Sequence, residues 1–296
     1  MKKKTAKRVK SNSPVFEVIV FVVLAIYTLS MIALFLWAFN FSLKDSDKNL
    51  YINTFAIATD LKFSNYVTAF NALKVSTGLY DVYLDGLLVN SFVYSAGCAL
   101  MTVAATAIVA YCTARYDCRL SRFVHDMVIV LIVLPIVGNL AAQVQMTNVL
   151  KIYDTLIGSY SMKFSFINMY YLVLYASFKV LPKDYAESAF IDGASEFRVF
   201  WSIMLPLVST MLGAVFLLYF ISYWNDYQVP MVFLPSMPTA ALALANYTSG
   251  KGIEAAAAGI SVQIAGGVLV FIPVFAVFLV FRKKLMGNLT EGGIKE

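Results

Sequence analysis

The amino-acid sequence predicts an all-α, polytopic membrane protein with six transmembrane helices. Three observations predict this fold class: the composition, the spacing of long apolar runs and the uneven distribution of basic residues. Of the 296 residues, 60% are hydrophobic and only 14% are charged. Because a soluble domain carries about 25% charged residues, we expect a single domain that is solvated mainly by lipid.

The apolar runs have the length of membrane spans. A helix that crosses the hydrocarbon core needs about 20 mostly apolar residues. The expected spans cover about 18–43, 88–114, 127–148, 164–181, 207–229 and 259–281. The run 227–250 is also uncharged, but Pro230, Pro235 and Pro238 interrupt any helix there. We therefore expect an outer loop or a partial helix after the fifth span.

The basic residues indicate the topology. Cytoplasmic segments of membrane proteins carry an excess of Lys and Arg. With the N-terminus inside, 16 of the 23 Lys and Arg residues fall in inner segments and 7 in outer ones. We therefore expect cytoplasmic tails at 1–17 and 286–296, on either side of a membrane domain at 18–285. The basic cluster precedes an apolar run, so it indicates a cytoplasmic N-terminus and not a nucleic-acid-binding face.

The sequence has no motif that is typical of an enzyme's active site. It has three cysteines at spacings that match no zinc motif, and His125 is the only histidine. It contains no phosphate-binding G-x-x-x-x-G-K-[ST] motif, no nucleophile elbow and no metalloprotease motif. We therefore predict no catalytic residue, no metal site and no cofactor in this chain.

The most informative segment is the polar loop 182–206, which the topology places in the cytoplasm. The stretch 183–191 is compatible with a short helix, because Asp184, Glu187 and Ile191 recur three and four residues apart. Gly193 is expected to end that helix, and Ser195 to cap the next one. By itself this pattern also fits an ordinary solvated helix in a cytoplasmic loop.

A longer pattern in this loop resembles the EAA loop of ABC-importer permeases. The matching residues are Glu187-Ser188-Ala189, then Gly193, Ile203 and Leu205-Pro206. The one departure is Ser188, where alanine is usual. Further similarities to maltose-type MalG permeases, in the carbohydrate branch, lie at Asn65-Tyr66, Asn90-Ser91, Trp224-Asn225-Asp226 and the C-terminal tail.

The resemblance implies an ABC importer type I permease fold and a transport role by alternating access. It implies a partner ATPase that binds ATP and Mg and docks on the loop. Partners would be a second permease, giving a heterodimer, two ATPase copies and an extracytoplasmic sugar-binding protein, in a bacterial cytoplasmic membrane. The implied ATPase-coupling residues are Glu187, Ser188, Ala189, Asp192, Gly193 and Pro206. The implied ATPase-contacting tail residues are Gly287, Thr290, Gly292, Gly293 and Lys295.

Polar side chains within the spans are candidates for the translocation path. Such groups face a cavity or a neighbouring helix. The candidates are Asn139, Gln143, Tyr223, Asn225 and Asp226. The competing interpretation is structural, with polar groups acting as contacts between helices.

Two other functions are weighed against sugar import. The cargo of an ABC importer could instead be an amino acid, a polyamine or phosphate. Alternatively, the chain could be a secondary transporter or channel that works alone. Few acidic residues lie within the expected spans, whereas ion-coupled pumps commonly use intramembrane ionisable groups.

Overall fold

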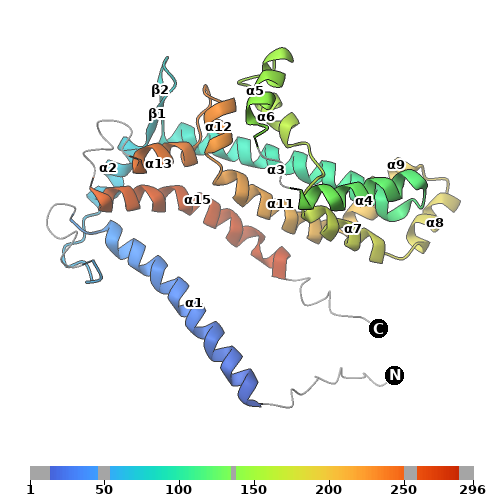
Figure 1. Ribbon diagram of the computed structural model, residues 1–296. Coiled ribbons are helices and arrows are strands. Elements are labelled where there is room, and N and C mark those ends of the chain that lie inside the picture. Colours follow the sequence, from blue (N-terminus) through green and yellow to red (C-terminus); the bar gives the residue numbers. More distant parts are fainter. Residues whose placement is uncertain (1–13, 46–53, 135–137, 250–258, 287–296) are drawn as a thin grey trace. The chain divides into compact units, whose positions relative to one another are not determined.

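The computed structural model describes residues 14–45, 54–134, 138–249 and 259–286 (Figure 1). The chain divides into two compact units. One comprises Met1–Ala69 and Ala258–Val268, and the other comprises Phe70–Ala257 and Leu269–Glu296. The described part is mostly helical.

The first unit contains the long helix α1, Pro14–Ser42. Almost all side chains in the middle of α1 are exposed, and the helix is highly apolar. Its C-terminal end is tied to the residues that follow it. Asn40 Nδ2 donates to the carbonyl of Ala56, and Asn65 Nδ2 donates to the carbonyls of Ser42 and Lys44. The apolar surface of α1 thus suits lipid or another protein.

The second unit is built around helix α3, Leu84–Arg115. Helix α3 packs along α11, Ser209–Trp224, and along α7, Tyr170–Val180 (Figure 1). Helix α6, Leu156–Lys163, also lies against it. The largest core cluster forms between these helices and includes Tyr111, Tyr171, Phe178 and Val215. Helix α3 therefore lies at the centre of this unit, and α6, α7 and α11 pack on it.

Three helices in the described residues are long and apolar enough to cross a membrane by themselves. They are Val15–Ser42, Leu84–Arg115 and Ile260–Arg282. The last belongs to α15, Ile260–Met286, which has Pro273 inside it. A fourth candidate is the pair Glu196–Leu207 and Ser209–Trp224, which is bent by 77°.

The expected third and fourth spans differ from continuous helices. In place of 127–148 the structure has α4, Arg119–Val133, and α5, Leu140–Val149. Leu134 is extended, as expected of a residue before a proline, and Gly138 has a φ of +85°. In place of 164–181 the helix α7 begins only at Tyr170, after Asn168 accepts a hydrogen bond from the Tyr171 amide. It ends just before Leu181-Pro182.

The remaining elements are short. Helix α2 is Ser64–Ala72, and strands β1, Lys74–Ser76, and β2, Asp81–Tyr83, form an antiparallel hairpin. The proline-rich run after α11 forms α12, Gln228–Phe233, and α13, Ala240–Thr248. The expectation of partial helices there is confirmed for the described residues.

Candidate functional site

Helix α8, Asp184–Ile191, presents a mixed acidic and apolar surface. Glu187 and Ser188 are exposed, and Ile191 is 86% exposed. Ala189 faces the other way, with 8% exposure, and joins the main core cluster. One side of the helix is therefore anchored, while the other offers a carboxylate and an isoleucine one turn apart.

A glycine ends helix α8. Gly193 has a φ of +79°, and its amide donates to the carbonyl of Phe190. The amide of Ala194 donates to the carbonyl of Ala189. This pair of bonds is the Schellman pattern of helix termination, which favours glycine at the left-handed position. The predicted helix break at Gly193 is confirmed, and Asp192 lies exposed just before it.

The second half of the loop begins with the predicted cap. The Ser195 hydroxyl accepts a hydrogen bond from the Arg198 amide at the start of α9, Glu196–Val199. A π-helical turn η1, Phe200–Met204, and α10, Leu205–Leu207, follow. Pro206 lies exposed in α10, near the bend that leads into α11.

This half of the loop is fixed to the end of α3. The Tyr111 ring lies 4.8 Å from that of Phe200. Arg115 lies 3.4 Å from the carbonyl of Pro182 and 3.5 Å from the Met204 sulfur. These contacts join the loop to the end of α3, the longest helix of the unit.

A further bond joins the two segments. The Tyr116 hydroxyl donates to the Glu196 carboxylate. Burial and this bond raise the pKa of Tyr116 above its usual range. The hydroxyl therefore stays protonated at neutral pH and remains a donor.

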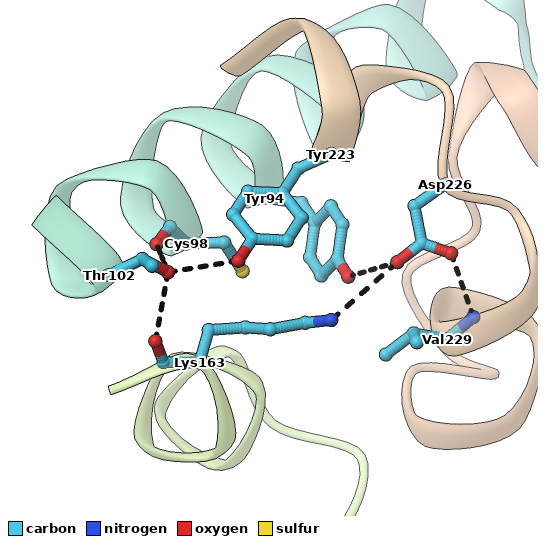
Figure 2. A network of polar contacts seen from close by, with 7 residues as sticks. All are labelled: Tyr94, Cys98, Thr102, Lys163, Tyr223, Asp226 and Val229. Carbon is cyan, nitrogen blue, oxygen red and sulfur yellow. Dashed lines mark hydrogen bonds and ion pairs between the residues drawn. The ribbon is translucent and has the colours of Figure 1, made fainter. Parts of the chain in front are cut away.

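A second polar cluster lies in the same unit, between α3, α6 and the end of α11 (Figure 2). Asp226 is its centre. Its carboxylate accepts hydrogen bonds from the Tyr94 hydroxyl, at 3.3 Å, and from the Val229 amide, at 3.1 Å. Lys163 Nζ lies 3.8 Å from Asp226 Oδ2, and the two side chains are 21% and 19% exposed.

The other half of the cluster surrounds Thr102. Its hydroxyl lies 2.9 Å from the Tyr223 hydroxyl and 2.8 Å from the carbonyl of Lys163 (Figure 2). Lys163 Nζ lies 4.9 Å from the centre of the Tyr223 ring, a cation–π arrangement. Tyr219 stacks on Tyr223 at 5.7 Å. The arrangement combines hydrogen-bonding groups with aromatic faces.

The close packing of α6 on α3 positions Lys163 beside Asp226. A Cβ at Gly97 would meet the Tyr160 ring at 2.2 Å. The Tyr160 hydroxyl donates to the carbonyl of Val93. Only a glycine lets α6 approach α3 so closely, and this approach positions the lysine at the end of α6.

The structure brings together only part of the predicted path. Tyr223 and Asp226 belong to the cluster. Asn225 is exposed and donates to the carbonyl of Ile221 in its own helix. Asn139 is exposed and Gln143 half-buried at α5, with no contact to Asp226 recorded among the described residues. The five predicted tail residues, Gly287 to Lys295, lie outside the described residues.

Sequence reasoning missed Tyr94, Thr102 and Lys163. A signal for the first two was present, because positions 94, 98, 102 and 106 recur every four residues on one face of a helix. Lys163 lies before a predicted span, so charge counting assigned it to an outer loop. Only the packing of α6 reveals its carboxylate partner.

Comparisons with known proteins show which proteins this helical chain resembles. No family model matches the chain. It is 27% identical over 238 residues to the arabinooligosaccharides transport system permease protein AraQ of Bacillus subtilis, covering 79% of each chain. It is 24% identical over 294 residues to the diacetylchitobiose uptake system permease protein NgcG of Streptomyces coelicolor, covering 98% of this chain and 92% of the relative.

A solved structure shares the fold. It is a chain of a bacterial ABC transporter involved in the import of the acidic polysaccharide alginate, with a TM-score of 0.73 and 20% identity. The match covers 94% of this chain and 99% of the other. Relatives of this chain include several sugar transport permeases, which confirms its resemblance to ABC-importer permeases of the carbohydrate branch.

Proposed function

We propose that this chain is the transmembrane subunit of an ATP-driven ABC importer that moves a sugar or oligosaccharide into a bacterial cell. The homology to sugar permeases supports the cargo class. ATP hydrolysis belongs to a partner chain, since the sequence has no phosphate-binding loop. The partners are a second permease, two ATPase copies and an extracytoplasmic sugar-binding protein.

The chain crosses the cytoplasmic membrane six times, with both termini inside. The charge count of 16 inner and 7 outer basic residues supports this topology. Helices α4 and α5 supply the third crossing, and α7, with residues 164–169 before it, supplies the fourth. Non-helical backbone at such depth is tolerated where protein covers it, and the packing of α7 on α3 supports such cover for the fourth crossing.

The surface of α8 carries this proposal. Glu187 and Ile191 are exposed on a helix whose opposite side, at Ala189, is locked into the core. The loop contacts the end of α3 at two places, where Phe200 packs on Tyr111 and where Pro182 accepts a hydrogen bond from Arg115. A knob that is exposed and rigidly joined to membrane helices can convert closure of a docked ATPase into movement of those helices. In this role Glu187 pairs with a cation on the ATPase.

The cluster around Asp226 lies beside the translocation path. Sugars are bound by hydrogen bonds together with stacking on aromatic faces, and Tyr219 and Tyr223 offer stacked rings next to charged groups. Asn139, Gln143 and Asn225 contribute polar surface elsewhere along the path. The tail from Gly287 to Lys295 contacts the ATPases and adjusts their closure.

Charge reversal on α8 tests the coupling. In the complete complex in proteoliposomes, Glu187→Lys should reduce ATP-dependent sugar uptake at least tenfold, because a like charge replaces the attraction between chain and ATPase. ATPase activity should persist but lose its stimulation by sugar-loaded binding protein. Uptake is measured with labelled sugar and hydrolysis by phosphate release.

The matched control is Asp60→Lys, which reverses an exposed carboxylate on the proposed outer segment. It should leave ATP-dependent uptake within about twofold of the unmodified protein. Normal uptake by the Glu187→Lys variant, in a complex assembled to the same extent, would contradict the proposal that α8 docks on the ATPase through Glu187.

A further inference from the structure

A cleft of about 540 Å³ lies at the end of α3 where the coupling loop begins. Its walls come from the end of α3 with the residues just after it, the first turns of α4, the end of α7 and Lys183. Figure 1 shows α4, α7 and α8 gathered around this end of α3. Neither the loop's docking surface nor the cluster around Asp226 uses this cleft.

The cleft is lined by more cations than anions. Its two carboxylates are Asp117 and Asp126. Its four basic side chains are Arg115, Arg122, Lys179 and Lys183. Asp117 is already paired with Arg122, at 3.0 Å. The remaining three basic groups face one carboxylate, so the cleft attracts an anion.

The donors in this cleft are incompletely used. Arg115 lines the cleft, and its Nη2 donates to the carbonyl of Pro182 at 3.4 Å. A guanidinium has five N–H donors, so Arg115 can still donate to an anion. Lys179 Nζ donates to the Tyr175 hydroxyl at 2.8 Å and retains further donors. The Tyr175 ring is held by stacking on His125 at 4.3 Å.

Helix α4 also carries exposed apolar side chains, on the side of the helix that faces away from the cleft. Leu120 and Phe123 are 70% and 65% exposed, and Val130 is exposed about two turns beyond Phe123. Cations at the ends of membrane helices attract the anionic headgroups of phospholipids. The headgroup phosphate would enter the cleft, and the exposed apolar side of α4 would face the lipid chains around it.

We propose that this cleft binds a phosphate group, supplied by the headgroup of an anionic phospholipid. The same donors would accept a soluble phosphate, so the experiment separates the two sources. The position at the membrane surface rests on the proposed topology. Neither the cargo nor the ATPase enters into it, and a binding measurement on the purified full chain can therefore fail independently of transport.

The test is a titration of the purified full-length chain, in detergent, followed by native mass spectrometry. Phosphatidylglycerol should bind more tightly than phosphatidylcholine, whose choline cation offsets the phosphate charge. Arg115→Gln should weaken phosphatidylglycerol binding about fivefold, and Lys179→Gln with Lys183→Gln about 25-fold, since each cation near a membrane surface contributes about a fivefold factor. The control Arg119→Gln removes an exposed cation of α4 that does not line the cleft.

Each outcome has a defined meaning when the variants keep the melting temperature of the unmodified chain. Selective phosphatidylglycerol binding that the double variant loses and Arg119→Gln retains supports the lipid source. Saturable binding of inorganic phosphate, lost in the same double variant but without lipid preference, supports the phosphate site with a soluble ligand. Lipid and phosphate binding that the double variant leaves unchanged, or that Arg119→Gln weakens equally, would overturn the proposal.

Discussion

Asp226 and Lys163 illustrate what single residues contribute to this fold. Each charge is about four-fifths buried, and the two groups lie 3.8 Å apart. Removing one partner leaves the other charge poorly compensated in a low-dielectric environment, whereas removing both avoids that cost. Asp226 also caps the turn into α12 through the Val229 amide, so its side chain stabilises local backbone as well.

A double-mutant cycle tests the pairing of these two charges. Lys163→Met and Asp226→Leu should each lower the free energy of unfolding by about 1–3 kcal/mol, because each strands a partly buried charge. The double variant should lose less than the sum of the two single losses. The measurement is thermal unfolding of the purified chain in detergent. Strictly additive losses would show that the two charges act independently.

At the scale of elements, the loop 182–206 depends on how α8 ends. Gly193 adopts a φ of +79°, and a Cβ built there would meet nothing within 4 Å. A substitution at this position is therefore penalised by the backbone conformation alone and not by crowding. The turn sets the direction in which α9 leaves α8, and so the position of the exposed face of α8 relative to α3.

Gly193→Ala should weaken the turn between α8 and α9 by about 1–2 kcal/mol, the cost of a left-handed conformation for a residue with a Cβ. The amide of Ala194, which bonds to Ala189, should exchange its hydrogen about 5–30-fold faster. Gly213→Ala is the control, because it also has open space at the Cβ but lies within α11. Unchanged exchange at Ala194 would contradict the proposed role of this turn.

The sequence predicted those elements whose signals are local. The break at Gly193 and the cap at Ser195 follow from conformational preferences of single residues, and both are present. The apolar runs at α1, α3 and α15 are long and uninterrupted, and these are the helices that can span a membrane unaided.

Two differences from the expected spans had local signals that a search for uncharged runs does not detect. Pro135 and Gly138 lie inside 127–148, and Asn168 caps the late start of α7. For the candidate site, Tyr223 and Asp226 could be named from the sequence. Lys163 could not, because its place beside Asp226 depends on the close approach at Gly97.

At the scale of the whole molecule, the proposed membrane topology connects the separate features. The proposal puts the loop at the side where ATP is available and residues 44–85 at the outer surface. It also leaves the exposed apolar surface of α1 to lipid or to a second permease. A rigid loop, a basic cleft beside it and a buried charged cluster all belong to the unit built on α3.

Cysteine labelling tests this topology. In a variant that lacks Cys98, Cys112 and Cys118, a cysteine at Ser188 should react with a membrane-impermeant maleimide only after the membrane is opened. A cysteine at Lys151 should react in intact cells, because the charge count places it outside. The opposite pattern would invert the topology and remove α8 from the reach of a cytoplasmic ATPase.

The most direct test of the central claim is uptake by the reconstituted complex. Proteoliposomes should contain this chain, its paired permease, the ATPase and the binding protein, with ATP enclosed on the ATPase side. We predict accumulation of a labelled sugar that requires hydrolysable ATP, and no accumulation when ATP is replaced by a non-hydrolysable analogue. Equal uptake without ATP, driven by an ion gradient through this chain alone, would contradict the account.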